Sequence, residues 1–265
     1  MPQIPISDPD DPRLDDYRNI PDATLLEQRG LFVAEGRLVV RRLLTSPFAT
    51  RSLLVTDTAL TDLGDAIEGH DLPVYVVPQR VMNDVAGFNV HRGCLAAGIR
   101  PQPQDWRALA AGARTIVVME QVGNADNVGA IFRNAAAFGA GAVLLGPSCA
   151  DPLYRKAIRT SMGAALQVPF APMPTWLDDL GDLRGMDFTL VALTPSEDAT
   201  PLDQCELSGK VALLLGHEGA GLSDAARAHA SVLARIPMAG GTDSLNVATA
   251  AAVALYEFGN ERRSG

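Results

Sequence analysis

Short runs of apolar residues recur along the second half of the chain, and helical or loop segments separate them. Four runs rich in β-branched and aliphatic residues span residues 115–119, 142–145, 189–193 and 211–215. A strand that is apolar at every position is buried on both faces, which is typical of a parallel sheet covered by helices. The pattern therefore predicts an α/β domain with a parallel sheet over residues 112–265.

The first part of the chain alternates in the same way on a smaller scale. Apolar strands are expected at residues 53–55, 74–77 and 94–99. Residues 36–44 carry leucine and valine at helical spacing, which predicts an amphipathic helix. We therefore expect a smaller α/β domain over residues 23–100.

Two polar segments flank this smaller domain. Residues 1–22 are rich in aspartate and proline and hold little apolar material, so we expect a flexible acidic lead-in. Residues 101–111 begin with two closely spaced prolines and no apolar anchor, which predicts a linker. The expected order is thus lead-in, smaller domain, linker and larger domain.

The composition is that of an ordinary globular protein, with 47% hydrophobic and 20% charged residues among 265. The longest apolar runs are too short to span a bilayer, and the N-terminus lacks the basic and apolar regions of a signal peptide. We therefore expect a cytoplasmic protein with no membrane partner. Three separated cysteines without a CxxC pair and four scattered histidines predict neither a disulfide framework nor a metal site.

The net charge of −9 argues against a protein that binds nucleic acid through bulk positive charge. Affinity for a phosphate backbone depends on local cations, however, and these are almost all arginine, since Lys156 and Lys210 are the only lysines. Arginine binds phosphate through two parallel hydrogen bonds and stacks on bases, so a few well-placed arginines can suffice.

Three segments that can carry chemistry each follow an apolar run, where ligands of open α/β sheets gather. In residues 120–134, Asn127 can cap the following helix and Arg133 lies about one and a half turns inside it. Its apolar neighbours make a freely solvated Arg133 less expected than on an ordinary amphipathic helix. In residues 216–223, three glycines allow close approach of backbone to a ligand and surround Glu218.

In the third segment, residues 236–247, Ser244 or Asn246 can cap the last helix. Each segment taken alone also fits a structural role: a helical arginine in solvent, an ordinary glycine-rich turn or a capped C-terminal helix. The glycine order is GxxGxG, which is not the dinucleotide fingerprint.

Together the three segments resemble the three sequence motifs of the SpoU/TrmH family of RNA 2'-O-ribose methyltransferases, which belongs to the SPOUT class. The matching stretches are residues 127–133, residues 215–219, and residues 236–238 with 244–248, in the family's order. Residues 151–165 are similar to the family's connecting region. Residues 32–37 resemble the ribosomal-protein-like RNA-binding domain that often precedes the catalytic one.

The resemblance implies a parallel sheet with a deep trefoil knot, a homodimer, and S-adenosylmethionine held by backbone contacts. The residues that match the cofactor-binding positions are Gly216, Ile236, Leu245, Thr194 and Leu215. The residues that match the catalytic positions are Arg133, Asn127, Glu218, Ser244 and Asn246. The reaction would be attack of a ribose 2'-hydroxyl on the sulfonium methyl group, which an apolar pocket favours.

The family analogy makes Arg133 the group that handles the hydroxyl proton. Because the pKa of an arginine lies above about 12, a more modest role is that Arg133 binds the substrate phosphate and hydroxyl. RNA contact in the smaller domain is assigned to Arg37, Arg41 and Arg42, which share one side of the expected helix. A solvated helix face is the alternative interpretation of these three arginines.

Several alternatives remain open beside this hypothesis. An RNA-binding or ribosome-associated protein without catalysis would keep the same fold, although the joint presence of the five catalytic matches argues against it. An oxidoreductase is disfavoured because GxGxxG does not follow the first strand of the larger domain. Methylation of a base is a further alternative. Ribosomal RNA is preferred to transfer RNA as the substrate because of the added N-terminal domain.

Overall fold

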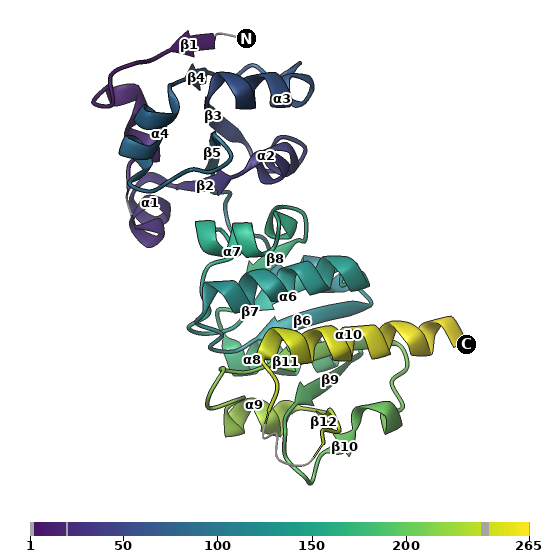
Figure 1. Ribbon diagram of the computed structural model, residues 1–265. Helices are drawn as coiled ribbons and strands as arrows, with labels where there is room; N and C mark the ends of the chain where they lie inside the picture. The colour runs from purple at the N-terminus through teal and green to yellow at the C-terminus, as the bar shows by residue number, and fades with distance from the viewer. Residues whose placement is uncertain (1–2, 20, 240–243, 265) are drawn as a thin grey trace. The chain divides into compact units, whose positions relative to one another are not determined.

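The computed structural model describes residues 3–19, 21–239 and 244–264, without the side chains of residues 259–264. The chain divides into two compact units (Figure 1). The first unit holds Met1–Gln102 and Pro152–Gln167, and the second holds Pro103–Asp151 and Val168–Gly265. In the described residues, no helix is long and apolar enough to cross a membrane.

The described part of the first unit forms a mixed five-stranded sheet in the order β1-β4-β3-β5-β2. The strands are β1 (Gln3–Pro5), β2 (Leu31–Glu35), β3 (Thr50–Val55), β4 (Val74–Val76) and β5 (Cys94–Ile99). The helices of its N-terminal segment are α1 (Asp22–Arg29), α2 (Arg37–Leu44), α3 (Asp57–Ile67), α4 (Gln79–Ala86) and the 3-10 helix η1 (Pro12–Tyr17). The three strands expected here are present, whereas β2, which immediately precedes α2, is a strand that the hydrophobic pattern did not predict.

The structure differs from the flexible lead-in expected for residues 1–22. Strand β1 pairs in parallel with β4, and the side chains of Ile6, Leu14 and Tyr17 are buried in the core of the first unit. The Tyr17 hydroxyl also forms a hydrogen bond of 2.7 Å with the hydroxyl of Ser52. A few apolar anchors therefore order an acidic segment, because each one buries enough surface to offset the cost of fixing the backbone nearby.

The expected boundary between the domains also needs correction. Within residues 101–111, helix α5 (Trp106–Ala111) begins at an Asp105 cap, and Trp106 is buried in the core of the second unit. Helix α7 (Arg155–Thr160) was expected in the larger domain, but it belongs to the first unit, where it packs against β2. The two prolines at 101 and 103 led to the prediction of a linker over residues 101–111. They mark the end of the first segment of unit 1, but the second unit begins directly after them and no long linker follows.

The described part of the second unit is a sheet of seven parallel strands in the order β10-β12-β9-β11-β6-β7-β8. They are β6 (Thr115–Met119), β7 (Ala142–Leu145), β8 (Phe170–Pro172), β9 (Phe188–Leu193), β10 (Thr200–Pro201), β11 (Lys210–Leu215) and β12 (Val232–Arg235). The predicted parallel sheet is confirmed, and its four expected strands are β6, β7, β9 and β11. Strands β8, β10 and β12 were not predicted because runs of two to four residues carry too little pattern.

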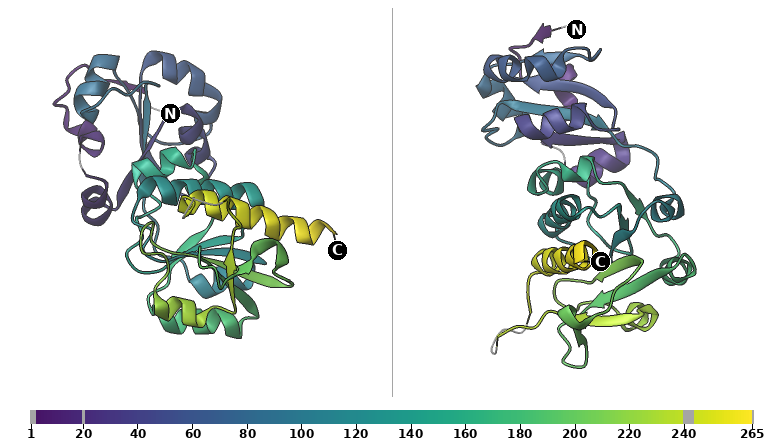
Figure 2. Two further views of the ribbon diagram at one scale, coloured as in Figure 1. Left: turned by 60° about the horizontal axis from the view of Figure 1, so that its bottom comes forward. Right: turned by 90° about the vertical axis from the view of Figure 1, so that its right-hand side faces the viewer.

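Helices cover both faces of this sheet. Helix α6 (Ala125–Phe138) and helix α10 (Val247–Ser264) lie side by side on one face, and α5, α8 (Trp176–Gly185) and α9 (Asp224–His229) lie on the other (Figure 2). Because all the strands run in parallel, the carboxyl ends of β6, β7, β9 and β11 meet at one edge.

Candidate functional site

A pocket of about 720 Å³, its open mouth included, lies at the carboxyl ends of β9 and β11. All five residues expected to bind the cofactor line it, namely Gly216, Ile236, Leu245, Thr194 and Leu215. Glu218 and Ser244, expected to be catalytic, line it too. Residues 240–243 of the third segment lie outside the described residues. Segments separated by up to about fifty residues in the chain thus meet at one place, where strand ends of a parallel sheet converge.

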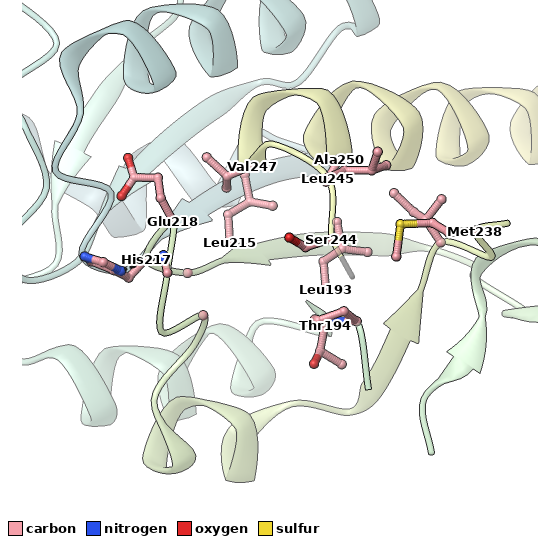
Figure 3. A pocket seen from close by; sticks show the side chains of 15 residues that line it. Leu193, Thr194, Leu215, His217, Glu218, Met238, Ser244, Leu245, Val247 and Ala250 are labelled. Carbon is pink, nitrogen blue, oxygen red and sulfur yellow. Dashed lines mark hydrogen bonds between the residues drawn. The ribbon is translucent and has the colours of Figure 1, made fainter. Parts of the chain in front are cut away.

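The interior of the pocket is mainly apolar. Figure 3 shows the hydroxyl group of Ser244 near its middle and Thr194 below it, with Glu218 and His217 toward one end and Met238 toward the other. Such a lining suits a ligand with an extended apolar part and a few polar groups.

The glycine-rich turn after β11 brings backbone to the pocket wall. A Cβ atom on Gly216 would lie 2.2 Å from the carbonyl carbon of Gly221 and 2.2 Å from the amide nitrogen of Leu222, so no side chain fits there. The backbones of His217 and Gly221 exchange hydrogen bonds of 3.0 and 2.9 Å. Gly216 therefore allows two backbone segments to touch, and the turn forms a compact wall that only glycine permits.

His217 is a functional candidate that the sequence interpretation missed. Its ring Nδ1 accepts hydrogen bonds from the amides of Gly219, at 2.8 Å, and Ala220, at 3.1 Å. Nδ1 is therefore the unprotonated ring nitrogen, and Nε2 carries the proton. The signal in the sequence was an acceptor side chain two and three residues before the amides of a glycine-rich turn.

A chain of hydrogen bonds joins three of the five expected catalytic residues. The Nδ2 atom of Asn127 donates to Oε1 of Glu218 over 2.9 Å, and Nδ2 of Asn246 donates to Oδ1 of Asn127 over 2.8 Å. Oδ1 of Asn246 then accepts from the amide of Ala248 and caps α10. These contacts fix the starts of α6 and α10 relative to the turn after β11.

The cap of α6 is not the one expected. The side chain of Asn124, rather than that of Asn127, accepts from the amide of Asp126 over 2.9 Å. Asn127 instead lies in the first turn of α6, is only 9% exposed, and turns toward Asn246. At the third segment, by contrast, the expectation is confirmed. Asn246, one of the two residues expected to cap the last helix, does so.

Glu218 is held as a carboxylate. Partial burial by itself would raise the pKa of this carboxyl, but hydrogen bonds from the Asn127 side chain and from backbone amides, including that of Asn124, lower the pKa below its ordinary value. The amide of Asn124 donates to Oε1 over 3.1 Å, near the N-terminus of α6. The positive end of that helix also favours the negative charge. Glu218 therefore acts as an acceptor that anchors its neighbours.

Replacing Glu218 by glutamine is expected to cost more stability at neutral pH than in acid. Because the folded-state pKa is lowered, the carboxylate stabilises the fold fully above the ordinary value of 4.5, and this stabilisation disappears as the pH falls through the lowered pKa. Urea unfolding of both proteins at pH 7 and below pH 4 measures the difference. Glu197→Gln, an exposed position after β9, controls for net charge. A Glu218→Gln deficit that is equal at both pH values would contradict this assignment.

Glu120 is another carboxylate at the same edge of the sheet and, unlike Glu218, it is fully buried. It is 2% exposed, and its oxygens accept from Nε1 of Trp176 at 2.9 Å and from the hydroxyl of Ser223 at 2.7 Å. All these donors belong to loops or helices that follow strand ends. Glu120 therefore ties the loops after β6 and β11 together and supports the pocket wall from behind.

Arg133 is not brought together with the other four expected catalytic residues. It lies exposed on α6, it is not among the residues that line the pocket, and it forms no ion pair with any residue that the structure describes. Asn127 and Asn134 are seven residues apart, so they share the side of α6 that faces α10, where Nδ2 of Asn134 donates to the carbonyl of Ala248. Arg133 lies on a different side of the helix.

The three arginines expected to contact RNA are engaged within the first unit. Arg37 forms an ion pair with Asp62, and Arg41 binds Asp65 through two hydrogen bonds of 2.6 and 2.8 Å. Nη1 of Arg42 donates to the carbonyl of Met162 over 2.7 Å. The carboxylates of α3 thus neutralise much of the expected patch, which could not be foreseen because they lie about 25 residues away in the chain.

No group of three or more His, Cys, Asp and Glu side chains within the described ranges has an arrangement that could hold a metal ion.

Comparison with known proteins gives a consistent result. Residues 114–256 match the model of a family described as the SpoU rRNA Methylase family. An uncharacterized tRNA/rRNA methyltransferase of Mycobacterium tuberculosis is 46% identical over 261 residues, which cover 95% of this chain and 90% of that protein. A 23S rRNA (guanosine-2'-O-)-methyltransferase, RlmB, of Xylella fastidiosa is 34% identical over 212 residues, or 78% of this chain and 85% of that one.

Among solved structures, an RNA 2'-O ribose methyltransferase superposes with a TM-score of 0.81 at 26% identity, covering 99% of this chain and 100% of that one.

Proposed function

The chain belongs to the SpoU rRNA methylase family and is therefore an RNA methyltransferase, and from that premise we propose that it transfers the methyl group of S-adenosylmethionine to a ribose 2'-hydroxyl of ribosomal RNA. The observation that carries the proposal is the pocket at the ends of β9 and β11, where all five residues matched to cofactor-binding positions converge. A methyltransferase acting on the ribose of transfer RNA is the second candidate, since the Mycobacterium tuberculosis relative is named for both RNA classes.

The residues present fit S-adenosylmethionine. Gly216 leaves room for backbone at the wall, and Leu215, Ile236 and Leu245 supply apolar contacts for a bent ligand. When bound, S-adenosylmethionine supplies an electrophilic methyl group on a sulfonium. The apolar walls keep water from this centre, which favours a transfer in which opposite charges are neutralised.

The chain's own residues then position the RNA. Glu218 holds Asn127 by a hydrogen bond, and Asn127 holds Asn246, so polar groups at the pocket's edge are preorganised for the ribose. We assign to Arg133 the binding of the substrate phosphate and the stabilisation of the hydroxyl oxygen as it loses its proton. Arginine suits this role because its guanidinium stays charged and offers several donors.

A homodimer reconciles the exposed Arg133 with catalysis. Helix α10 packs on α6, the side chains of Val253 and Tyr256 are exposed, and the exposed Phe138 of α6 stacks edge-to-face on Tyr256 with the ring centroids 6.1 Å apart. Exposed apolar side chains clustered on two adjacent helices are typical of a subunit interface. We therefore propose that dimerisation through α6 and α10 brings Arg133 of one subunit to the pocket of the other.

Val253→Glu is expected to convert the dimer to a monomer, because a carboxylate buried without a partner in an apolar interface costs several kcal/mol. Size-exclusion chromatography with light scattering measures the mass. Leu177→Glu, on α8 at the opposite face of the sheet, is the matched control, since Leu177 is 37% and Val253 is 39% exposed. A Val253→Glu protein that stays dimeric would exclude this interface.

The trefoil knot and the cytoplasmic location remain part of the proposal. Support for the knot comes from the path after β9, since β12 lies beside β9 on the side away from β11, and the chain then returns to place α10 against α6.

The decisive experiment transfers radiolabelled methyl groups from S-adenosylmethionine to total RNA and maps 2'-O-methylated positions by nuclease digestion. Label in a 2'-O-methylated nucleotide of ribosomal RNA is expected. Label confined to transfer RNA would favour the second candidate, label in a base would refute ribose methylation, and absence of both cofactor binding and transfer would indicate an RNA-binding protein without catalysis.

A further inference from the structure

His217 presents a hydrogen-bond donor at one end of the pocket. It lines the pocket and is exposed. Its Nδ1 atom is used within the glycine-rich turn after β11, where it accepts from the amides of Gly219 and Ala220. The proton of the neutral ring is therefore on Nε2, and no residue in the described ranges accepts a hydrogen bond from that atom. The ring thus offers one N–H group to a ligand at this end of the pocket.

This donor is held in a fixed place by the backbone of the turn. The two hydrogen bonds to Nδ1 orient the ring, and the backbones of His217 and Gly221 exchange two further hydrogen bonds. The preceding residue, Gly216, packs directly against the backbone of Gly221 and Leu222. A donor that is already oriented loses little conformational freedom when a ligand binds, so more of its interaction energy contributes to affinity.

The ring lies beside the groups proposed to position the ribose. His217 precedes Glu218, whose carboxylate accepts a hydrogen bond from Asn127. Figure 3 shows His217 and Glu218 at the end of the pocket opposite Met238, with the ring of His217 directed away from Ser244. The N–H group is therefore placed for the substrate rather than for the apolar part of the pocket, where the cofactor is expected.

The charge at this end of the pocket indicates which chemical group the ring can bind. Glu218 carries the only formal charge among the described residues that line the pocket, and hydrogen bonds that lower the pKa of its carboxyl keep it ionised. A phosphate bound to Nε2 of His217 would lie near this carboxylate and be repelled by it. The N–H group therefore suits a neutral acceptor, such as a carbonyl oxygen or an unprotonated ring nitrogen of a nucleobase.

We propose that His217 binds the base of the nucleotide that is methylated, with Nε2 donating to an acceptor atom on the edge of that base. The ribose has other partners at this edge of the pocket, since the side chains of Asn127 and Asn246 lie there. The inference rests on the proposed function in taking an RNA nucleotide as the substrate. His217 then helps to select the nucleotide, because a base without an acceptor at this position leaves the donor unpaired.

Two substitutions separate the roles of the two ring nitrogens. His217→Asn keeps an acceptor at the position of Nδ1, where an asparagine side chain can accept from the same two amides, and it removes the donor at Nε2. His217→Gln keeps an N–H donor at the distance of Nε2 from the backbone and removes the acceptor at Nδ1. His229→Asn, at the end of α9 on the other face of the sheet, is the matched control.

Methyl transfer to total RNA from cells that lack the gene gives kcat and an apparent KM for RNA, and calorimetric titration gives Kd for S-adenosylmethionine. His217→Asn is expected to raise KM about fivefold and to change kcat and the cofactor Kd less than about twofold, because it removes one neutral hydrogen bond and keeps the turn. The dependence of KM on salt is expected to stay unchanged, since no phosphate contact is lost.

His217→Gln is expected to show the reverse pattern. The turn loses its side-chain acceptor, so the cofactor Kd rises about threefold, whereas KM rises less than in His217→Asn because a donor remains. His229→Asn is expected to change none of these constants. Mapping of the methylated positions gives a further expectation, namely that His217→Asn also labels nucleotides with other bases, since the discriminating contact is lost.

Wild-type constants in His217→Asn, or equal changes of KM and cofactor Kd in both variants, would overturn the base contact while wild-type transfer upholds the proposed function. A raised KM with label only at the wild-type positions would assign Nε2 to the ribose, and a lower salt dependence would assign it to a phosphate. Each of these two results would also overturn the base contact.

A wild-type protein that methylates no RNA would overturn the proposed function. The His217 contact is then decided by filter retention of the same RNA on the full-length protein. Weaker binding by His217→Asn than by His229→Asn, with an unchanged salt dependence, would support the contact. Equal binding by the two variants would overturn it as well.

Discussion

Replacing Arg133 by alanine is expected to abolish methyl transfer, with kcat lowered at least about 100-fold, while affinity for S-adenosylmethionine changes less than about twofold. Groups that handle a proton or stabilise a developing negative charge contribute about 10²- to 10⁴-fold to rate. Arg133 is exposed on α6 and does not line the pocket, so its loss should disturb neither the fold nor the cofactor contacts. Single-turnover transfer and calorimetric titration separate the two effects.

Arg184→Ala, an exposed arginine at the end of α8, is the matched control and is expected to retain full activity. Arg133→Lys keeps the charge but not the planar array of donors, and should recover only a small part of the rate. Near-wild-type turnover of Arg133→Ala would remove Arg133 from the mechanism.

Gly216→Ala is expected to eliminate S-adenosylmethionine binding, raising Kd more than about 100-fold, and to lower the melting temperature. The added methyl would overlap the backbone of Gly221 and Leu222 at 2.2 Å, and backbone cannot rotate away as a side chain can. The turn would have to open, which moves the pocket wall and the Glu218 anchor together. Calorimetric titration and thermal unfolding measure the two consequences.

Gly219→Ala in the same turn is the control. A Cβ at Gly219 meets only ring atoms of His217, at 3.5 Å, which is ordinary van der Waals contact. Full cofactor affinity in Gly219→Ala and none in Gly216→Ala would assign the effect to the backbone contact. Tight cofactor binding by Gly216→Ala would show that the wall of the pocket does not form the cofactor site.

Mixing these two inactive proteins tests whether the active site is shared between subunits. If Arg133 acts on the partner's pocket, a heterodimer of Arg133→Ala and Gly216→Ala subunits contains one site with both elements intact. Random exchange of subunits would then restore about a quarter of wild-type activity. If Arg133 acts within its own subunit, mixing restores nothing.

The hydrophobic pattern was sufficient to predict the main strands of the parallel sheet. It predicted neither the short strands nor the ordered structure of the acidic N-terminal segment. Strands β6 and β7 begin and end where the apolar runs do, because a strand buried on both faces must be apolar throughout. The acidic residues 3–19 were expected to be flexible, yet Leu14 and Tyr17 anchor them in a core whose other members are distant in the chain. Composition averages over a segment, whereas burial is decided residue by residue.

The residues of the candidate pocket could be predicted from the sequence. The arrangement of the five expected catalytic residues could be predicted only in part. The family resemblance groups Gly216, Ile236 and Leu245 as cofactor-binding positions, and the structure brings them together at the edge where ends of parallel strands converge. The buried support from Glu120 depends on hydrogen bonds across loops, and nothing in local spacing marks it. The position of Arg133 away from the pocket is set by the packing of α6 on α10, which motif order does not reveal.

The sequence by itself determined the parallel α/β sheet and the two units in outline. These properties follow from periodic burial of apolar side chains and from the direction of parallel strands, and both are local or nearly local in the chain. Only the tertiary structure decided which polar groups are partnered. Glu218 meets Asn127 across 91 positions and Arg41 meets Asp65 across 24, and a hydrogen bond or ion pair forms only when the fold brings its two groups within about 3 Å.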